Sequence, residues 1–131
     1  FGVTFITKFD FIFCCGLLYH MIEPIKMLNL MSKISNNFFI WTLIVSEEEE
    51  KKWNKDDIID INVDGFSCKG YKYFYPERYD RNYAGSHKYC VRLTLDTIIN
   101  VCKHNGFSSK KFKCPNGNTS NDVVNLYFYR D

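Results

Sequence analysis

The stretch from Phe9 to Leu30 reads FDFIFCCGLLYHMIEPIKMLNL and constrains the fold more than any other part of the chain. Phe9 to Cys15 is almost wholly apolar and rich in aromatic residues, which is typical of a strand buried on both faces of a parallel sheet. Gly16 ends this strand, and Glu23 and Pro24 begin a helix, because proline at the first helical position needs no N–H. Apolar residues then recur at helical spacing, at Ile25, Leu28, Met31 and Ile34. The turn between strand and helix lies at the carboxyl end of the strand, where ligands bind in open α/β sheets.

Three further strands complete one predicted sheet. The apolar run over residues 37–45 follows the helix, so the right-handed crossover rule makes it the parallel neighbour of the first strand. Thr94 as N-cap and Gly106 beyond the last turn bracket a second helix. Strands near residues 108–114 and 122–129 are joined by the turn cluster PNGNTS, and its Asn-Gly pair is typical of an antiparallel hairpin. We therefore expect the last strand to run antiparallel to its neighbours.

The composition indicates one globular domain. The chain has 131 residues, of which 46% are hydrophobic, enough to bury a modest core. A net charge of +2 is too small to argue by itself for a nucleic-acid partner. The apolar run that starts at Phe11 is broken by His20, Glu23 and Lys26, well short of the about 20 residues that span a membrane. No signal-peptide pattern is present. We expect a cytoplasmic protein with no membrane partner.

The cysteine pattern argues against both a disulfide framework and a metal site. The six cysteines are scattered, and no C-x-x-C pair occurs among them. Cys14 and Cys15 are neighbours in the predicted strand, so their side chains point to opposite faces. The expectation is that all six are reduced thiols used as small apolar residues, with no bound metal.

Three segments carry a resemblance to a known family. The run FDFIFCCGLLYHMIEP resembles the signature FD-x-V-x-C-x-G-[VL]-LYH-x-x-x-P, which marks the fourth strand and the following turn in a large group of class I S-adenosylmethionine-dependent methyltransferases. NNFFIWT, at 36–42, resembles the fifth strand, and LTLDTIINVCKHNGF, at 93–107, resembles the helix before the sixth. The resemblance implies the α/β class and the C-terminal half of a Rossmann-like methyltransferase sheet. It implies parallel strands plus a final antiparallel strand, and S-adenosylmethionine as cofactor. The aromatic-rich segment after the fifth strand would be an insertion in this sheet.

The resemblance also implies a site at the glycine turn, which in the family borders the methyl-donor pocket. The cofactor-binding candidates are Cys15, Gly16, Leu17 and Tyr19: the backbone of Cys15 and Gly16 would approach the donor, and Tyr19 would face its methyl end. His20 is the candidate catalytic residue, because it is the turn's only group with a pKa near neutrality and could orient a substrate or take a proton. The alternative for His20 is a structural histidine that hydrogen-bonds the turn backbone.

Residues 46–92 are predicted to form an insertion or lid on the substrate side. The insertion opens with the charge run SEEEEKKWNKDD, which suits a short solvated helix and in which Trp53 alone could cover a pocket. Aromatic residues then alternate with lysine and arginine over residues 58–88. Three interpretations are open: a lid over the active site, a surface that stacks RNA bases, or a β-hairpin that packs its tyrosines on the domain. The candidate substrate-side residues are Trp41, Trp53, Tyr83 and Arg92.

The chain departs from the family at specific positions. Leu43 and Ile44 stand where relatives often carry histidine and an aromatic residue, and Arg92 stands where they often carry tryptophan. The family also holds its cofactor mainly through an upstream glycine-rich loop and a carboxylate at the end of the second strand, and no such loop precedes Phe9. We therefore expect residues 1–131 to be a partial methyltransferase domain, the C-terminal part of a longer protein, and inactive alone.

The predicted function is methyl transfer from S-adenosylmethionine to a small-molecule or tRNA substrate, once the missing N-terminal half of the domain is present. One alternative is an RNA-binding or tRNA-modifying module that uses the basic aromatic segment. Another is a non-catalytic remnant with a structural role.

Overall fold

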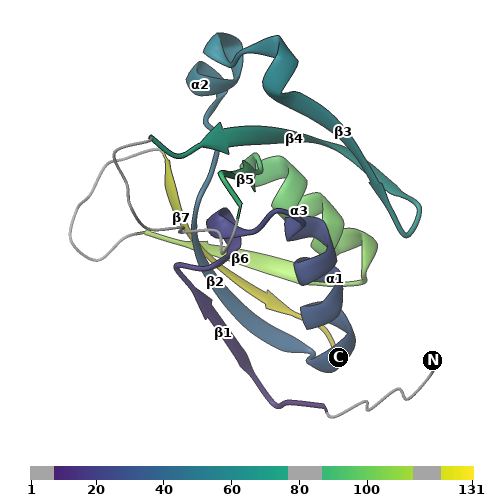
Figure 1. Cartoon of the computed structure of the whole chain (residues 1–131). Coiled ribbons are helices and arrows are strands. Elements are labelled where there is room, and N and C mark those ends of the chain that lie inside the picture. The colour runs from purple at the N-terminus through teal and green to yellow at the C-terminus, as the bar shows by residue number, and fades with distance from the viewer. Residues whose placement is uncertain (1–7, 77–86, 114–121) are drawn as a thin grey trace.

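The computed structural model describes residues 8–76, 87–113 and 122–131, which form two β-sheets and the helices that pack on them (Figure 1). The larger sheet has four strands in the order β1-β2-β7-β6. β1 and β2 are parallel, and β7 is antiparallel to both of its neighbours, which confirms the predicted strands and their directions. The bounds of these strands are β1 Ile12–Cys15, β2 Asn37–Leu43, β6 Ser108–Phe112 and β7 Val123–Tyr129.

The first two strands are shorter than predicted. Phe9 lies outside β1 and forms an isolated parallel bridge with Ser35, and its N–H donates to the Ile34 carbonyl at 2.8 Å. Val45 similarly lies beyond β2 and bridges Thr94. An apolar run indicates which residues are buried, but it does not show where the continuous hydrogen-bonded strand begins and ends. The prediction therefore included residues that flank the two strands.

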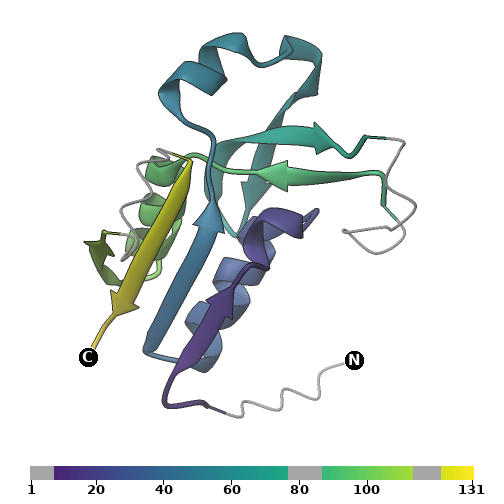
Figure 2. The same ribbon diagram turned by 90° about the vertical axis from the view of Figure 1, so that its left-hand side faces the viewer.

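Both long helices cover the same face of the four-stranded sheet. α1 spans Pro24–Ile34 and α3 spans Leu95–His104, and both lie behind the sheet in Figure 2. α1 begins at Pro24, as predicted. The Thr94 hydroxyl accepts the Thr97 N–H at 3.2 Å at the start of α3, and Gly106 follows its end at a φ of +89°, which confirms both predicted caps.

The core fills the space between this face and the two helices. Its central residue is Phe38, whose ring centroid lies 4.9 Å from that of Phe107 and 5.1 Å from that of Phe128. Burial alternates along β2, so that residues 38, 40 and 42 face the helices. The large core side chains that are at most 1% exposed include Ile25, Leu28, Phe38, Ile40, Val91, Ile98, Val101, Leu126 and Phe128.

The opposite face of the sheet corrects the expectation that the first strand is buried on both faces. Phe11 and Phe13 are 46% and 70% exposed. Phe13 stacks on Phe39 with ring centroids 5.0 Å apart, and Phe11 stacks on Tyr127 at 6.2 Å. The two helices lie on the other face, so neither of them covers this apolar surface.

The second sheet is antiparallel and lies within the predicted insertion. It has the order β3-β4-β5, with bounds Ile58–Val63, Phe66–Phe74 and Tyr89–Arg92. β3 and β4 form a hairpin through Asp64 and Gly65, which both have positive φ, 51° and 79°, as a two-residue hairpin turn requires. The described part of this segment contains the β-hairpin that the third interpretation predicts. Ile61 and Val63 pack against the core from the hairpin side.

A short helix, α2 at Glu47–Lys52, leads from the large sheet to the second one and confirms the helix predicted in the charge run. Ser46 and Glu49 cap it reciprocally, since each side chain accepts the other residue's N–H at 3.3 Å. A 3₁₀ turn, η2 at Lys55–Asp57, follows. None of the described helices combines the length and apolar character that crossing a membrane requires.

Candidate active site

The turn after β1 is held by a hydrogen bond to β2 at its start and by a buried leucine in its middle. Gly16 has a φ of +71°, a left-handed conformation that favours glycine, and its N–H donates to the Trp41 carbonyl at 3.1 Å. A 3₁₀ turn, η1 at Leu18–His20, follows. Leu18 anchors it in the core with 2% of its surface exposed, while Tyr19 and His20 stay half-buried. The fold therefore presents Tyr19 and His20 at the carboxyl end of a parallel strand.

Three rings meet around Gly16. The Tyr19 ring lies edge-on to Trp41 with centroids 6.0 Å apart, and its centroid lies 4.2 Å from that of His20. A Cβ placed on Gly16 would lie 3.7 Å from Trp41 Cζ3 and 3.9 Å from the Tyr19 hydroxyl, so both side chains border the bare backbone. The structure thus brings together four of the predicted site residues.

The second sheet reaches the same turn. His20 Nδ1 lies 2.8 Å from the Tyr75 hydroxyl, and the two rings stack with centroids 6.1 Å apart. The Val91 N–H donates to the Met21 carbonyl at 2.9 Å, which fastens β5 to the end of the turn. The His20 ring is therefore oriented by a residue 55 positions away in the chain.

Cys90 lies close to this contact and is bound to the same strand pair. The Cys90 thiol donates to the Tyr73 carbonyl at 3.8 Å. Which of His20 Nδ1 and the Tyr75 hydroxyl donates to the other depends on the tautomer of the imidazole ring.

Burial and charge set the protonation states of this group. Burial lowers the pKa of His20 below 6.5, and the positive charge of Arg92 lowers this pKa further. Burial and the hydrogen bond to Cys90 raise the pKa of the Tyr75 hydroxyl. The Arg92 guanidinium lies over Tyr73, with Cζ 3.7 Å from the ring centroid. At neutral pH the arrangement holds a neutral histidine that can accept a proton. We call Gly16, Tyr19, His20, Trp41, Tyr75 and Arg92 the turn site.

We expect an NMR titration of the histidine ring protons to place the pKa of His20 below 6.5, the ordinary value. Replacing Arg92 by methionine should raise this pKa without restoring 6.5, since burial is the larger cause. Because the folded state disfavours protonation of His20, its contribution to stability is present above about pH 6.5 and is lost as the pH falls through the lowered pKa. Arg130→Met, at the other end of the sheet, is the control. A wild-type pKa at or above 6.5 would contradict the electrostatic description.

The remaining predicted residues lie apart from this group or outside the described residues. Cys15 and Leu17 flank Gly16 with exposed side chains. Trp53 donates from Nε1 to the Lys72 carbonyl at 3.2 Å and lines a separate hollow of about 340 Å³, which no residue of the turn site borders. Tyr83 lies outside the described residues.

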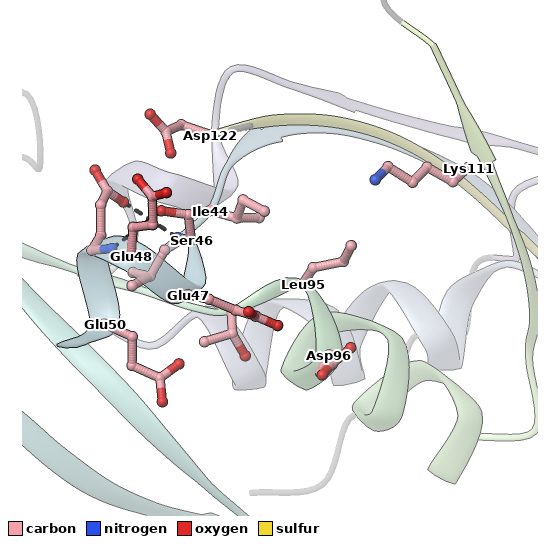
Figure 3. Close-up of a pocket in the computed structure, with 12 residues that line it drawn as sticks. Ile44, Ser46, Glu47, Glu48, Glu50, Leu95, Asp96, Lys111 and Asp122 are labelled. Carbon is pink, nitrogen blue, oxygen red and sulfur yellow. Dashed lines mark hydrogen bonds between the residues drawn. The ribbon is translucent and has the colours of Figure 1, made fainter. Parts of the chain in front are cut away.

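A wider hollow of about 590 Å³ lies beyond the end of β2, between α2 and the start of α3 (Figure 3). Its wall is mainly acidic, with Lys111 on the far side. Within the described part of the chain, no group of three or more histidine, cysteine, aspartate or glutamate side chains could hold a metal ion. The rings and the histidine that could align a reactant lie at the turn site instead. The acidic side chains around the hollow are Glu47, Glu48, Glu49, Glu50, Asp96 and Asp122.

Three residues of this neighbourhood were missed by sequence reasoning: Tyr73, Tyr75 and Cys90. The alternation of Tyr71, Tyr73 and Tyr75 in the sequence is a signal that could have found two of them, because residues two apart share one face of a strand. No local pattern links Tyr75 to His20.

The fold is shared with solved methyltransferase structures. No protein-family model matches the sequence, and no curated protein is similar enough to count as a relative. Two crystal structures of the N-terminal domain of EvdMO1, one in the presence of SAH and D-fucose and one with SAH bound, match with a TM-score of 0.58 and 23% identity. The match covers 94% of this chain and 47% or 46% of those chains.

A third structure is an S-adenosylmethionine-dependent methyltransferase from Clostridium acetobutylicum ATCC 824, which matches with a TM-score of 0.52 and 12% identity over 98% of this chain and 60% of that one. The chain thus spans about half the length of the first two structures and three fifths of the third. Across the part that it shares with them, this chain has the fold of S-adenosylmethionine-dependent methyltransferases.

Proposed function

We propose that this chain is part of a class I S-adenosylmethionine-dependent methyltransferase, with the turn site facing the methyl end of the cofactor and the methyl acceptor. The observation that carries the proposal is the position of the turn site. In a fold shared with SAH-bound structures, bare backbone, aromatic rings and a neutral histidine converge at the carboxyl end of a parallel strand. Ligands of open α/β sheets bind at this edge.

The residues of the turn fit such a cofactor. S-adenosylmethionine, when bound, supplies an electrophilic methyl group on a sulfonium sulfur. Gly16 leaves backbone uncovered between the exposed side chains of Cys15 and Leu17, and these three residues would hold the cofactor through their main chain. Tyr19 and Trp41, both half-buried, would form the wall that aligns the methyl end and excludes water.

His20 is the residue that we assign to proton transfer. Its ring lies in the turn, with Nδ1 2.8 Å from the Tyr75 hydroxyl, and the imidazole would take a proton from the methyl acceptor. The lowered pKa of His20 keeps the ring neutral, and hence able to accept that proton, at neutral pH.

We further propose that residues 46–92 form the substrate-side wall of the site. Tyr75 and Arg92 reach the turn from this segment, and the Val91 to Met21 hydrogen bond joins the two parts at 2.9 Å. Trp53 lines a different hollow and is not carried into the proposed site.

We propose that another segment of the same domain pairs with the free edge of β1 and covers Phe11 and Phe13. Among the described strands β1 pairs only with β2, and its phenylalanines form an apolar surface that water reaches. The coverage of the solved structures is in line with a domain about twice the length of this chain. We call this chain together with that segment the complete domain.

Calorimetric titration tests the proposal. We expect no measurable affinity of this chain alone for S-adenosylmethionine, because the described residues offer contacts to the methyl end only. The complete domain should bind it with micromolar affinity. A micromolar affinity of the isolated chain would contradict the proposal that the cofactor contacts are divided between this chain and the further segment. Failure of the complete domain to bind would favour the non-catalytic remnant.

The described residues give the RNA-binding alternative limited support. Tyr71 is buried and Arg92 covers one face of Tyr73, whereas Phe74 is 51% exposed and could stack on a base. Residues 77–86 of the basic aromatic segment, which include Tyr79 and Arg81, lie outside the described residues.

A further inference from the structure

The described part of the chain contains two arginines, and both rest on aromatic rings. Arg130 lies on Phe107 with Cζ 4.3 Å from the ring centroid. Its guanidinium donates from Nε to Asn36 Oδ1 at 2.9 Å, from Nη1 to the Asn105 carbonyl at 2.7 Å and from Nη2 to the Ser32 carbonyl. Every nitrogen of this guanidinium has an acceptor, so Arg130 is a structural arginine that ties the end of β7 to the helices.

Arg92 also lies over an aromatic ring, but its Nε lacks an acceptor. Its guanidinium lies closer to Tyr73, at 3.7 Å, than that of Arg130 does to Phe107. Its Nε is buried without a hydrogen-bond partner, and no described carboxylate forms an ion pair with it. A buried donor without an acceptor destabilises a fold, and such groups are uncommon in native proteins. The structure therefore maintains a donor here that its own described residues do not use.

The charge of Arg92 acts on two groups, and neither of them is negatively charged at neutral pH. The first is His20, which its lowered pKa keeps neutral, and the second is the Tyr75 hydroxyl. A guanidinium carries two N–H donors along each edge, a spacing that matches two oxygens of a carboxylate or phosphate. Arg92 follows Val91, whose N–H donates to the carbonyl of Met21, the residue after His20.

We propose that Arg92 is an anion-binding residue that takes a carboxylate or phosphate group, and that this group belongs to the methyl acceptor. Held there, the anionic group would place the rest of the acceptor against His20 and the rings of Tyr19 and Trp41. Only the second half of the proposal rests on the proposed function, because anion binding at Arg92 needs neither cofactor nor methyl transfer.

The test uses the whole chain labelled with ¹⁵N-arginine, without cofactor. Acetate and inorganic phosphate are titrated separately at constant ionic strength, and the Nε–H resonances of Arg92 and Arg130 are followed. We expect a saturable shift of the Arg92 resonance with at least one of the anions, and no saturable shift for Arg130. The anion with the higher affinity identifies the carboxylate or the phosphate as the preferred group.

Variants separate charge from geometry. Arg92→Lys, which keeps the charge but loses the two-pronged edge, should weaken binding by about tenfold, and Arg92→Gln should abolish it. Arg130→Lys is the matched control and should leave the affinity unchanged. Equal shifts of both arginines, no saturable shift at Arg92, or undiminished binding by Arg92→Gln would overturn the proposal. If Arg92→Gln fails to fold, the wild-type comparison of Arg92 with Arg130 still decides. Anion binding in a protein whose complete domain transfers no methyl group would refute the proposed function and leave the anion site standing.

Discussion

Replacing Tyr19 by alanine should lower the rate of methyl transfer by the complete domain about a hundredfold. Without the Tyr19 ring, the methyl group of the cofactor and the acceptor atom would no longer be held in line. Stability should fall far less. Tyr19 is half-buried and its ring contacts are with His20 and Trp41 at the surface of the turn, so truncation should cost about 1 kcal/mol. Single-turnover kinetics and urea denaturation of the same variant measure the two effects.

Leu18 provides the matched control, since it precedes Tyr19 in the same turn but is 2% exposed. Leu18→Ala should destabilise the fold by about 3 kcal/mol by leaving a cavity in the core. A Tyr19→Ala variant that loses as much stability as Leu18→Ala and keeps its turnover would show that Tyr19 is a packing residue, and the assignment of the turn site would fall.

The second large effect concerns the two faces of β2. Phe38→Ala should destabilise this chain by about 4 kcal/mol, because the ring is fully buried between the sheet and the helices. Phe39→Ala, one position along, should cost about 1 kcal/mol, because the described contacts of that ring are with Phe13 on the bare face. Urea denaturation followed by circular dichroism compares the two variants.

Phe13→Ala, measured in this chain and in the complete domain, tests whether the exposed face of the sheet is covered in the complete domain. Phe13→Ala should be almost neutral in this chain, where 70% of the residue is exposed, and should cost about 3 kcal/mol once a further segment packs on it. Equal and small costs of Phe13→Ala in both proteins would contradict the proposed covering segment.

The elements of the fold could be predicted where local chemistry determines them. Pro24 starts α1, Thr94 and Gly106 delimit α3, and the charge run forms α2 behind a Ser46 cap. Each of these signals acts within one turn of a helix, so the sequence around it suffices. The parallel β1–β2 pair follows from the helix between them, because the crossover has one favoured hand.

The layers and the site could be predicted less well. The continuous apolar run through β1 indicates two apolar faces, but it does not reveal that α1 and α3 both pack on one of them and leave Phe13 bare. The contact of His20 with Tyr75 depends on how the second sheet docks, which no local spacing encodes. The resemblance located the turn, whereas its partners came only from the tertiary arrangement.

The most direct test of the turn site is ¹⁹F NMR of the complete domain labelled with 5-fluorotryptophan and titrated with S-adenosylmethionine. Trp41 lies beside Gly16 and Tyr19, whereas Trp53 lines a separate hollow. Trp41→Phe and Trp53→Phe assign the two resonances. We expect the Trp41 resonance to shift with the affinity measured by calorimetry while that of Trp53 stays in place. A shift of Trp53 with none at Trp41, in a protein that binds the cofactor, would contradict the placement of the site at the turn after β1.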